Sequence, residues 1–368
     1  MTLLDGCVSP LFRATGPIQG YGGTLVDATG NEVRLTGMNW FGMETSTFCP
    51  HGLQFRSWQS MLDQIVSSGF NALRLPYCNT LFDAGSTPNS IDFTKNPDLQ
   101  GLTGQQIMDT IIGGAASRHM VVVLDRHDPT ANTPSGLWYT PAVPESRWIS
   151  DWTMLANRYK NQRAVIGADL HNEPHNPATW GTGNQQTDWN LAAERCGNAI
   201  LAANPNWLII VEGVQQVGND YYWSGGNLLG ARANPIRLTR GDRLVYSAHD
   251  YGPAQFQQAW FQASAGFPNN LPSIWTKHWG ELKADGLAPM FVGEFGGRSV
   301  GTDPEGVWQT HLVDYLKTNG LSYGYWTWTP DSGDTGGLLT NDWTTVDQAK
   351  LNLLRTYQYP TLSRVLSG

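Results

Sequence analysis

The chain has 368 residues, with 31 Asp and Glu against 23 Lys and Arg, and a formal net charge of −8. No basic patch carries interleaved aromatic residues, which argues against a nucleic-acid-binding protein. No apolar run approaches the ~18 residues of a membrane-spanning helix, so we expect no membrane segment. The sequence also holds 16 Trp, more than a core requires. Because flat aromatic faces suit sugar rings, we expect several Trp to line a groove.

The predicted elements begin with a hairpin over residues 22–35, "GGTLVDATGNEVRL", with a turn at Thr29-Gly30. Short apolar runs then alternate with amphipathic segments, in which apolar residues recur every three or four positions as in helices. The eight predicted strands span residues 33–41, 71–77, 120–127, 165–173, 207–213, 243–251, 289–295 and 322–329. The predicted helices include residues 57–69, 103–119, 145–160, 187–204 and 307–320.

This alternation of strands and helices predicts an α/β fold with a parallel sheet. Eight units that close on themselves form a (β/α)8 TIM barrel, and a doubly wound open sheet is the alternative. The hairpin is expected to cap the N-terminal face of the barrel. Because no linker rich in Pro, Ser and Thr divides the sequence, we expect residues 1–368 to form a single domain.

The four cysteines, Cys7, Cys49, Cys78 and Cys196, show no C-x-x-C spacing of a metal site. Cys196 shares a predicted helical face with apolar residues, which is typical of a free buried thiol. Cys49 and Cys78 each follow the end of one of two neighbouring strands. They are candidates for a disulfide bridge or for two free thiols, because spacing alone does not give the Cα separation.

Polar residues gather at the ends of the predicted strands, most densely in "ADLHNEPH" at residues 168–175. The carboxyl ends of all strands of a TIM barrel meet at one face, which holds the active site. Residues far apart in the sequence therefore converge there, Glu173 and Glu294 among them. The strand-end residues are Arg74, Asp125, Arg126, His127, Asp169, His171, Asn172, Glu173, His249, Tyr251, Glu294, Trp326 and Trp328.

Two convergent carboxylates with Arg and His around them, and without metal-ligand spacing, suit glycoside hydrolysis. One carboxyl protonates the leaving oxygen, and the other attacks the anomeric carbon or activates water. Arg74 would keep one glutamate ionised, while repulsion between like charges favours the protonated form of the other. This chemistry requires no metal and no organic cofactor. Taken alone, either glutamate would also fit a buried structural carboxylate.

The motifs "RLPY", "DRH", "HNEP", "HDY", "GEFG" and "YWTWTPDSGDTGG" occur in this order between residues 74 and 337. In order and spacing the chain resembles the retaining cellulases of glycoside hydrolase family 5, over roughly residues 23–350, and most of all bacterial endo-β-1,4-glucanases. The resemblance implies that Glu173 is the acid/base and Glu294 the nucleophile. It also implies substrate-site roles for Arg74 and Tyr251 (bonded to the nucleophile), Asn172 (sugar 2-hydroxyl), His127 and His249 (lining) and Trp326 (floor).

Two tryptophans, Trp40 and Trp223, are predicted to stack on sugar rings, whereas Trp180 and Trp260 fit the groove and the core equally. Where close relatives can carry cysteines, this chain has Thr179 and Thr182. The resemblance implies a secreted monomer that binds a β-glucan or cello-oligosaccharide. No signal peptide is readable in "MTLLDGCVSP", which lacks a cationic and a full apolar segment. The alternatives are a β-mannanase, xyloglucanase or licheninase on the same scaffold, or a non-catalytic glycan-binding protein.

Overall fold

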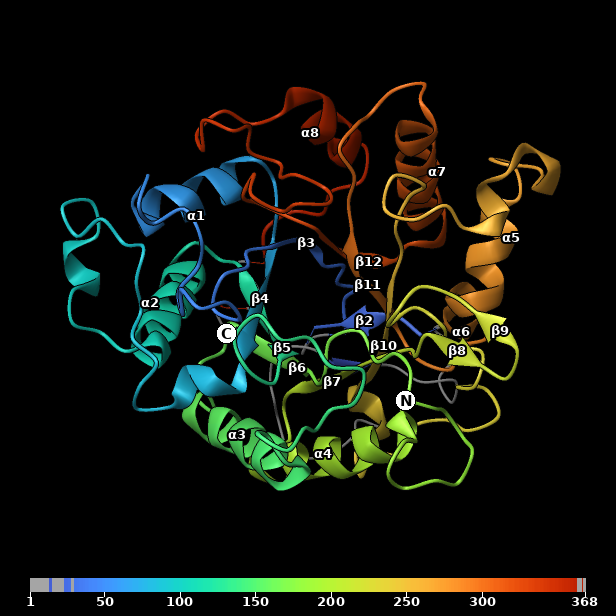
Figure 1. Ribbon diagram of the computed structural model, residues 1–368, viewed down its shortest axis with the longest axis horizontal. Coiled ribbons are helices and arrows are strands. Elements are labelled where there is room, and N and C mark those ends of the chain that lie inside the picture. The colour runs from blue at the N-terminus through green and yellow to red at the C-terminus, as the bar shows by residue number, and fades with distance from the viewer. Residues whose placement is uncertain (1–12, 15–22, 28–29, 363–365, 367–368) are drawn as a thin grey trace.

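The computed structural model describes residues 13–14, 23–27, 30–362 and 366. Eight parallel strands close into a barrel, and helices surround it (Figure 1). The closed barrel confirms the (β/α)8 prediction and excludes the open sheet. The barrel strands are β3 (Thr36–Asn39), β4 (Ala72–Cys78), β5 (Val121–Asp128), β6 (Val165–Asp169), β7 (Leu208–Glu212), β10 (Leu244–His249), β11 (Met290–Phe295) and β12 (Ser322–Tyr325).

Each barrel strand lies within a predicted strand or overlaps it closely, but several end earlier than the sequence pattern suggests. The strand predicted over residues 165–173 ends at Asp169. Beyond it, the N–H of Asn172 still bonds to the carbonyl of Arg126 at 3.1 Å. Glu173 then has a φ of 51°, in the left-handed region, and cannot continue a strand. The polar strand ends therefore turn away from the sheet and into the space above the barrel.

All five predicted helices are present, as α1 (Trp58–Ser67), α2 (Gly104–Ser117), α3 (Glu145–Arg158), α4 (Trp189–Ala203) and α7 (Pro304–Asn319). Three of them, α1, α2 and α7, begin with a side-chain cap. Thr103 and Gln106 form a capping box at the start of α2, and Asp303 caps α7, which ends at Gly320 with a φ of 59°. The sequence pattern missed α5 (Leu271–Trp275), α6 (Glu281–Ala284) and α8 (Gln348–Arg355).

The predicted N-terminal hairpin covers the end of the barrel at which its strands begin. Its first strand, β2 (Leu25–Val26), also pairs with β1 (Arg13–Ala14), and the Val33 N–H bonds to the Leu25 carbonyl at 2.9 Å. Leu25 and Val33 belong to one buried apolar cluster with residues from the beginnings of the barrel strands, among them Val121 and Phe291. Thr29 of the predicted turn lies outside the described residues. A second small hairpin, β8 (Gln216–Val217) and β9 (Asp220–Tyr221), follows β7.

Most tryptophans pack in the core rather than in a groove. Ten of the 16 are among the largest fully buried side chains. The core of this fold therefore holds far more Trp than we assumed from the count, and only the remaining ones can be among the several that were predicted to line a groove. These side chains fill the layer between the barrel and its helices, as with Trp148 and Trp152, whose indole N–H groups both donate to the Leu170 carbonyl.

The described cysteines are free thiols. Cys49 and Cys78 are both buried, and their Sγ atoms contact different backbone carbonyls, those of Asn89 and Met43. The structure therefore excludes the disulfide alternative for this pair. Cys196 is buried on α4 as a free thiol, as predicted. Cys7 lies outside the described residues.

Within the described part of the chain, none of the helices has both the length and the apolar character needed to cross a membrane.

The hairpin cap predicts a specific stability effect. Leu25 is 3% exposed at the barrel end, so we expect Leu25→Ala to lower the free energy of unfolding by about 2–4 kcal/mol, the usual cost of a buried Leu→Ala cavity. Denaturant unfolding measures this change. As a control, Phe256→Ala removes a side chain that is 64% exposed and should change the free energy by less than about 0.5 kcal/mol. Equal effects of the two substitutions would contradict the role of the cap.

Candidate active site

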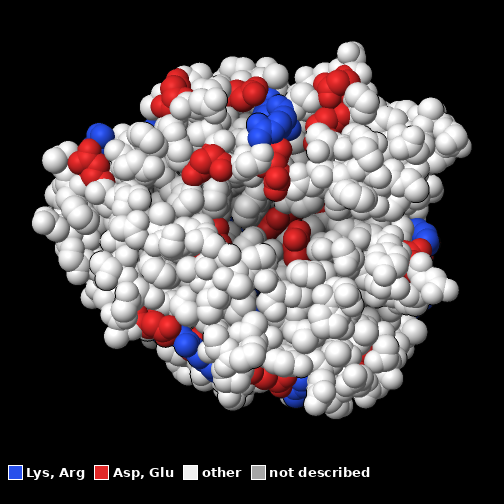
Figure 2. All heavy atoms as spheres, viewed as in Figure 1, with Lys and Arg blue, Asp and Glu red and all other residues white. Residues whose placement is uncertain are grey.

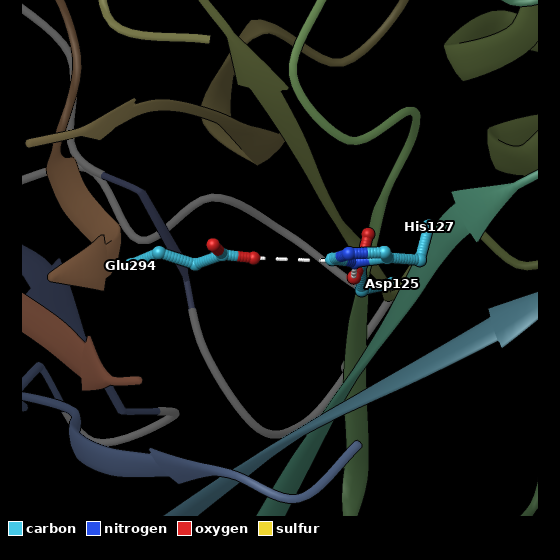
Figure 3. Close-up of side chains that lie close together, drawn as sticks. All are labelled: Asp125, His127 and Glu294. Atoms are coloured by element: carbon cyan, nitrogen blue, oxygen red, sulfur yellow. Dashed lines mark hydrogen bonds and ion pairs between the residues drawn. The ribbon is translucent and has the colours of Figure 1, made fainter. Parts of the chain in front are cut away.

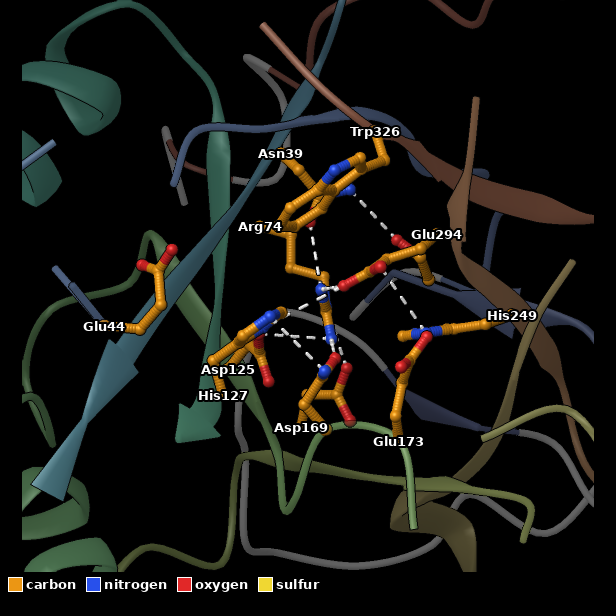
Figure 4. Close-up of polar contacts among 12 residues, drawn as sticks. Asn39, Glu44, Arg74, Asp125, His127, Asp169, Glu173, His249, Glu294 and Trp326 are labelled. Carbon is orange, nitrogen blue, oxygen red and sulfur yellow. Dashed lines mark hydrogen bonds and ion pairs between the residues drawn. The ribbon is translucent and has the colours of Figure 1, made fainter. Parts of the chain in front are cut away.

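One arginine, Arg74 on β4, lies at the centre of the polar cluster above the barrel. It is 1% exposed and donates hydrogen bonds to side chains from several strands (Figure 4). Its partners are Asn39 (3.0 Å), Asp169 (2.9 Å), Asn172 (3.0 Å), Glu212 (3.2 Å) and Glu294 (2.6 Å), with Asp125 in ion-pair distance at 3.2 Å. The guanidinium thereby fixes the relative positions of the strand ends.

Four buried carboxylates surround this single guanidinium: Asp125, Asp169, Glu212 and Glu294. Burial alone would lower the pKa of Arg74, but these charges raise it above its ordinary value. Burial and the neighbouring Glu212 raise the pKa of Asp169. Burial raises the pKa of Glu212 as well, but His249 and Arg74 oppose this shift, so Asp169 is the more readily protonated of the two.

Glu294, on β11, is held as a carboxylate. Its Oε2 accepts a hydrogen bond from the Tyr251 hydroxyl at 2.7 Å, and its Oε1 accepts one from Arg74. Burial would raise its pKa, but the charges of His249, Arg74 and His127 and the Tyr251 hydrogen bond lower the pKa of Glu294 to about 2. The group is therefore held in its ionised form.

His127, at the end of β5, lies between Asp125 and Glu294 (Figure 3). Its Nδ1 is 2.7 Å from Asp125 Oδ2 and 3.9 Å from Glu294 Oε1. Although burial favours the neutral ring, the charge of Asp125 and its hydrogen bond raise the pKa of His127. Asp125 thus orients the ring and favours a positive charge beside the nucleophile.

Glu173, just beyond β6, is the more exposed of the two predicted catalytic carboxylates, with 32% of its side chain accessible. Its Oε1 is 3.0 Å from His249 Nδ1. One carboxylate oxygen of Glu173 and one of Glu294 lie within 4.8 Å of each other. Figure 4 shows the two side chains, with His249, directed toward one another. This separation is nearer to the about 5–5.5 Å of retaining glycosidases than to the about 6.5–9.5 Å of inverting ones.

Trp326, which follows β12, packs over the cluster. Its ring stacks on His127 with a centroid distance of 5.4 Å and on Phe41 at 5.5 Å. The indole N–H bonds to Ser332 at 3.2 Å, which fixes the orientation of the ring. On the molecular surface, this region is a hollow with acidic side chains in it, near the centre of the face in Figure 2.

The structure corrects one predicted sugar contact. Trp40 is 0% exposed, and its indole N–H donates to the His51 carbonyl at 2.9 Å, so its ring cannot stack on a sugar. Trp223 is 8% exposed and lies edge-on to Tyr251 at 6.1 Å, at the border of the cluster. Of the two undecided rings, Trp180 is buried, whereas Trp260 is half-buried beside Trp223.

Sequence reasoning missed two members of the cluster, Asn39 and Glu212. Asn39 ends β3 and donates to the Gly293 carbonyl at 3.0 Å. Glu212 ends β7 and is 0% exposed. The sequence does mark both positions. Each of the two residues is a polar residue that ends an apolar run, Asn39 in "GMN" and Glu212 in "LIIVE". This is the pattern that identified the other strand ends.

The loop after β6 is held by a single carboxylate. Thr179 and Thr182, at the positions where relatives can carry cysteines, both donate to Asp188 Oδ1, at 2.6 and 2.8 Å. The Gly183 N–H donates to the other oxygen of Asp188 at 2.6 Å. Hydrogen bonds to a carboxylate therefore order this loop.

Three groups of side chains bring possible metal-ligand atoms within 4.8 Å of one another: Asp125, His127 and Glu294; Glu173, His249 and Glu294; and Asp125, Asp169 and Glu212. Each group has another explanation in this structure. Its carboxylates are paired with Arg74 or with a histidine. A divalent cation here would lie beside the guanidinium and be repelled by it.

Tyr251 provides a direct test of the electrostatics at Glu294. We expect Tyr251→Phe to raise the pKa of Glu294 by roughly 1–2, because a hydrogen bond to a charged group is worth about 1.5–3 kcal/mol. Carboxyl signals of isotope-labelled glutamate, followed against pH, would measure it. As a control, Tyr325→Phe removes a buried hydroxyl that bonds to Gln309 instead. If Tyr251→Phe left the titration unchanged, the hydrogen bond would not stabilise the carboxylate.

Known proteins match this chain over most of its length. The family model Cellulase (glycosyl hydrolase family 5) matches residues 26–332. An endoglucanase of Paenibacillus polymyxa is 52% identical over 363 residues, which cover 96% of this chain and 91% of the relative. The major extracellular endoglucanase of Xanthomonas campestris pv. campestris is 45% identical over 357 residues, 94% of this chain and 73% of the relative.

The fold is equally close to solved structures. An endocellulase variant from Pyrococcus horikoshii, solved in complex with cellotetraose, is 42% identical and superposes with a TM-score of 0.87, covering 94% of this chain and 98% of that one. The catalytic domain of the Xanthomonas enzyme gives a TM-score of 0.86 at 45% identity, over 90% of this chain and 97% of that one. The chain belongs to glycosyl hydrolase family 5, the cellulase family.

Proposed function

We propose that the protein is a retaining endo-β-1,4-glucanase that hydrolyses internal bonds of β-1,4-glucan chains within a single catalytic domain. The observation that carries the proposal is the pairing of an ionised Glu294 with a partly exposed Glu173, whose carboxylate oxygens lie within 4.8 Å. Retaining glycosidases use carboxyl groups about 5–5.5 Å apart, one as nucleophile and one as acid/base.

In the first step, a carboxylate oxygen of Glu294 attacks the anomeric carbon of the sugar, and the glycosidic bond breaks. The leaving oxygen takes the proton of Glu173, so that a glycosyl ester on Glu294 and a free sugar hydroxyl form together. Tyr251 and Arg74 hold the attacking carboxylate in place through their hydrogen bonds. Positive charge develops on the sugar ring in the transition state. The negative charge that the Glu294 carboxylate still carries at that point stabilises it.

In the second step, Glu173 acts as a base and removes a proton from water. The water oxygen attacks the same anomeric carbon, and the bond to Glu294 breaks. Two displacements at one carbon restore the β configuration. Because Glu294 leaves as a carboxylate, the charges that lower its pKa also make it a good leaving group.

The surrounding residues support binding of the sugar between the carboxylates. The Asn172 side chain, fixed by Arg74 at 3.0 Å, would bond to the 2-hydroxyl, where the interaction strengthens in the transition state. His127 and His249 would line the same position, and the face of Trp326 would form its floor. The border position of Trp223 favours a contact with the neighbouring sugar on the side of Tyr251.

The names of the relatives support β-glucan as the substrate. Endoglucanases and endocellulases recur among them, and one was solved with cellotetraose. The word "extracellular" in the name of the Xanthomonas relative supports secretion of this protein as well. No specific contact in the structure favours mannan, xyloglucan or lichenan over cellulose.

Substitution of each glutamate tests the roles. We expect Glu294→Gln to lower kcat by roughly 10³-fold or more, as when other covalent nucleophiles are removed, while cellotetraose binding by calorimetry persists. Glu173→Gln should lower kcat/KM by roughly 10²–10⁴-fold, the contribution of general acid catalysis. Glu305→Gln is a control, because Glu305 lies at the start of α7 and bonds to Ala254. Near-normal turnover by Glu294→Gln would rule out its role as the nucleophile.

A substrate panel tests the substrate class and the stereochemistry. We expect the release of reducing ends from carboxymethylcellulose to exceed that from mannan, xyloglucan and lichenan, with a rapid drop in viscosity because internal bonds are cut. Proton NMR of early products should show the β anomer first. Since neither step uses a metal, a chelator should leave the rates unchanged. An initial α anomer would indicate inversion, and preference for another glycan would move the assignment to that hydrolase.

A further inference from the structure

Glu212 is a third glutamate in the cluster, and neither step of the proposed mechanism uses it. It is the last residue of β7 and is 0% exposed. Its Oε2 accepts a hydrogen bond from the backbone N–H of Glu173 at 2.8 Å. Its Oε1 lies 3.3 Å from His249 Nε2 and 3.2 Å from Arg74 Nη2. The carboxylate thus contacts the acid/base residue along two separate routes.

The first route is through the backbone. Glu173 has a φ of 51°, a left-handed conformation that is unfavourable for a residue with a side chain. A hydrogen bond from its N–H to a carboxylate is charge-assisted and therefore stronger than one between neutral groups. Glu212 consequently offsets the strain that directs the Glu173 side chain into the cleft.

A glycine makes room for this contact. Gly225, with a φ of 71°, lies directly against the carboxylate. A Cβ atom there would come within 2.3 Å of Glu212 Oε2 and 3.2 Å of the Glu173 Cα. The Gly225 N–H also bonds to the Pro174 carbonyl at 3.4 Å. The loop after β7 is therefore shaped around the Glu173–Glu212 contact.

The second route is through His249, which lies between the two glutamates. Its Nδ1 is 3.0 Å from Glu173 Oε1, and its Nε2 faces Glu212. The contact with Glu212 is not aligned as a hydrogen bond, so it acts as a charge interaction. Burial alone would lower the pKa of His249, but the charges of Glu212 and Glu294 raise it. A positive ring therefore sits beside Glu173, with its charge balanced from behind by Glu212.

We propose that Glu212 is a positioning residue for the acid/base, which fixes the backbone of Glu173 and balances the charge of His249 so that Glu173 keeps its proton. This inference rests on the proposed function. Without Glu212, the ring of His249 would retain its contacts with Glu173 and Glu294. With the negative charge of Glu212 removed from the cluster, Glu173 would favour its ionised form, and protonation of the leaving group would weaken.

The charged and titratable groups around this unit come from every neighbouring strand. Facing Glu212 are Arg74 of β4, Asp125 of β5, Asp169 of β6, His249 of β10 and the Glu173 backbone. Around the Glu173 carboxyl are His249, Tyr251 and Glu294, while His175 contacts its backbone carbonyl. Among the described residues, His249 alone has an ion-pair contact with the carboxyl groups of both Glu173 and Glu212.

The test is Glu212→Gln, which preserves shape and leaves an oxygen able to accept from the Glu173 N–H. Two substrates are compared: cellotetraose, whose leaving group needs a proton, and dinitrophenyl β-cellobioside, whose phenolate does not. We expect kcat/KM on cellotetraose to fall roughly 10- to 100-fold, part of the ~10²–10⁴-fold supplied by general acid catalysis. The loss on the dinitrophenyl substrate should be several-fold at most. Equal losses on both would overturn the proposal.

Asp169→Asn is the matched control. Asp169 belongs to the same buried cluster, but its side chain accepts a hydrogen bond from Arg74, and no hydrogen bond or ion pair among the described residues joins it to Glu173 or His249. Because Arg74 holds the nucleophile, any loss in this variant should be the same on both substrates. A loss confined to cellotetraose in Asp169→Asn would show that the effect is a general property of the cluster, and would overturn the specific role of Glu212.

The pH profile gives a second readout. In Glu212→Gln, the basic limb of kcat/KM on cellotetraose should move to lower pH, because Glu173 loses its proton more readily. An unchanged limb or a shift to higher pH would overturn the proposal. If Glu212→Gln does not fold, Glu212→Asp is the second variant. It retains the negative charge, but its shorter side chain holds the carboxylate farther from the Glu173 N–H. That variant should show the same substrate-dependent loss with an unmoved basic limb, and an equal loss on both substrates would again contradict the proposal.

Failure of this inference is distinguishable from failure of the proposed function. A wild-type protein that cleaves neither cellotetraose nor the dinitrophenyl substrate would refute the function itself. A wild-type protein that cleaves both, with variants that lose both equally, would refute only the role of Glu212.

Discussion

The buried guanidinium of Arg74 is the interaction on which the site depends. Asp125, Asp169, Glu212 and Glu294 come from four other strands, and each is unfavourable to bury without a partner. One planar cation with five N–H donors pairs with all four of them and sets their separations. Because removal of one member of a buried ion pair typically costs about 3–5 kcal/mol, the catalytic geometry and the closure of the barrel are energetically linked. The same charges that stabilise the cluster keep the nucleophile ionised, so structure and chemistry have one electrostatic origin.

The fold could largely be predicted because each barrel strand is an apolar run with an amphipathic helix behind it, and both patterns are local. The carboxyl ends could not be placed to the residue. Hydrogen bonds and a left-handed backbone at Glu173, rather than apolar periodicity, determine where β6 gives way to the site. The helices α5 and α6 were missed because they are short and separated by a π-helical turn, Thr276–Gly280, which interrupts the usual spacing. Whether Cys49 and Cys78 are bonded depended on a distance that no sequence spacing contains.

For the site, the sequence identified residue types and the face on which they meet, but not the direction of each side chain. Arg74 and Tyr251 contact Glu294 as predicted, although Arg74 is the third residue of β4 rather than its last and has several other partners. Trp40 also follows a strand end, yet its ring turns into the core, where a backbone carbonyl accepts its N–H. Glu212 was overlooked because a single acid after "LIIV" has no neighbouring polar residues to draw attention to it. The roles of these residues in turnover remain predictions.

The loop after β7 carries a constraint of a different kind, on how the sequence can change in length. Its base is fixed by Gly213 and Gly225 and by the bridge between Val214 and Asn227. The backbone at Glu173 and Pro174 packs against this base, where the Gly225 N–H bonds to the Pro174 carbonyl. Its tip, residues 218–219 between β8 and β9, makes no described hydrogen bond to these groups, and the nearest link is at Asp220, which accepts from the Asn227 side chain at 3.1 Å. Evolutionary insertions and deletions are therefore compatible with catalysis at the tip, where loops generally accept them. At the base, a single added residue would displace Glu173. Relatives can diversify the rim of the cleft through this loop while the reaction chemistry stays fixed.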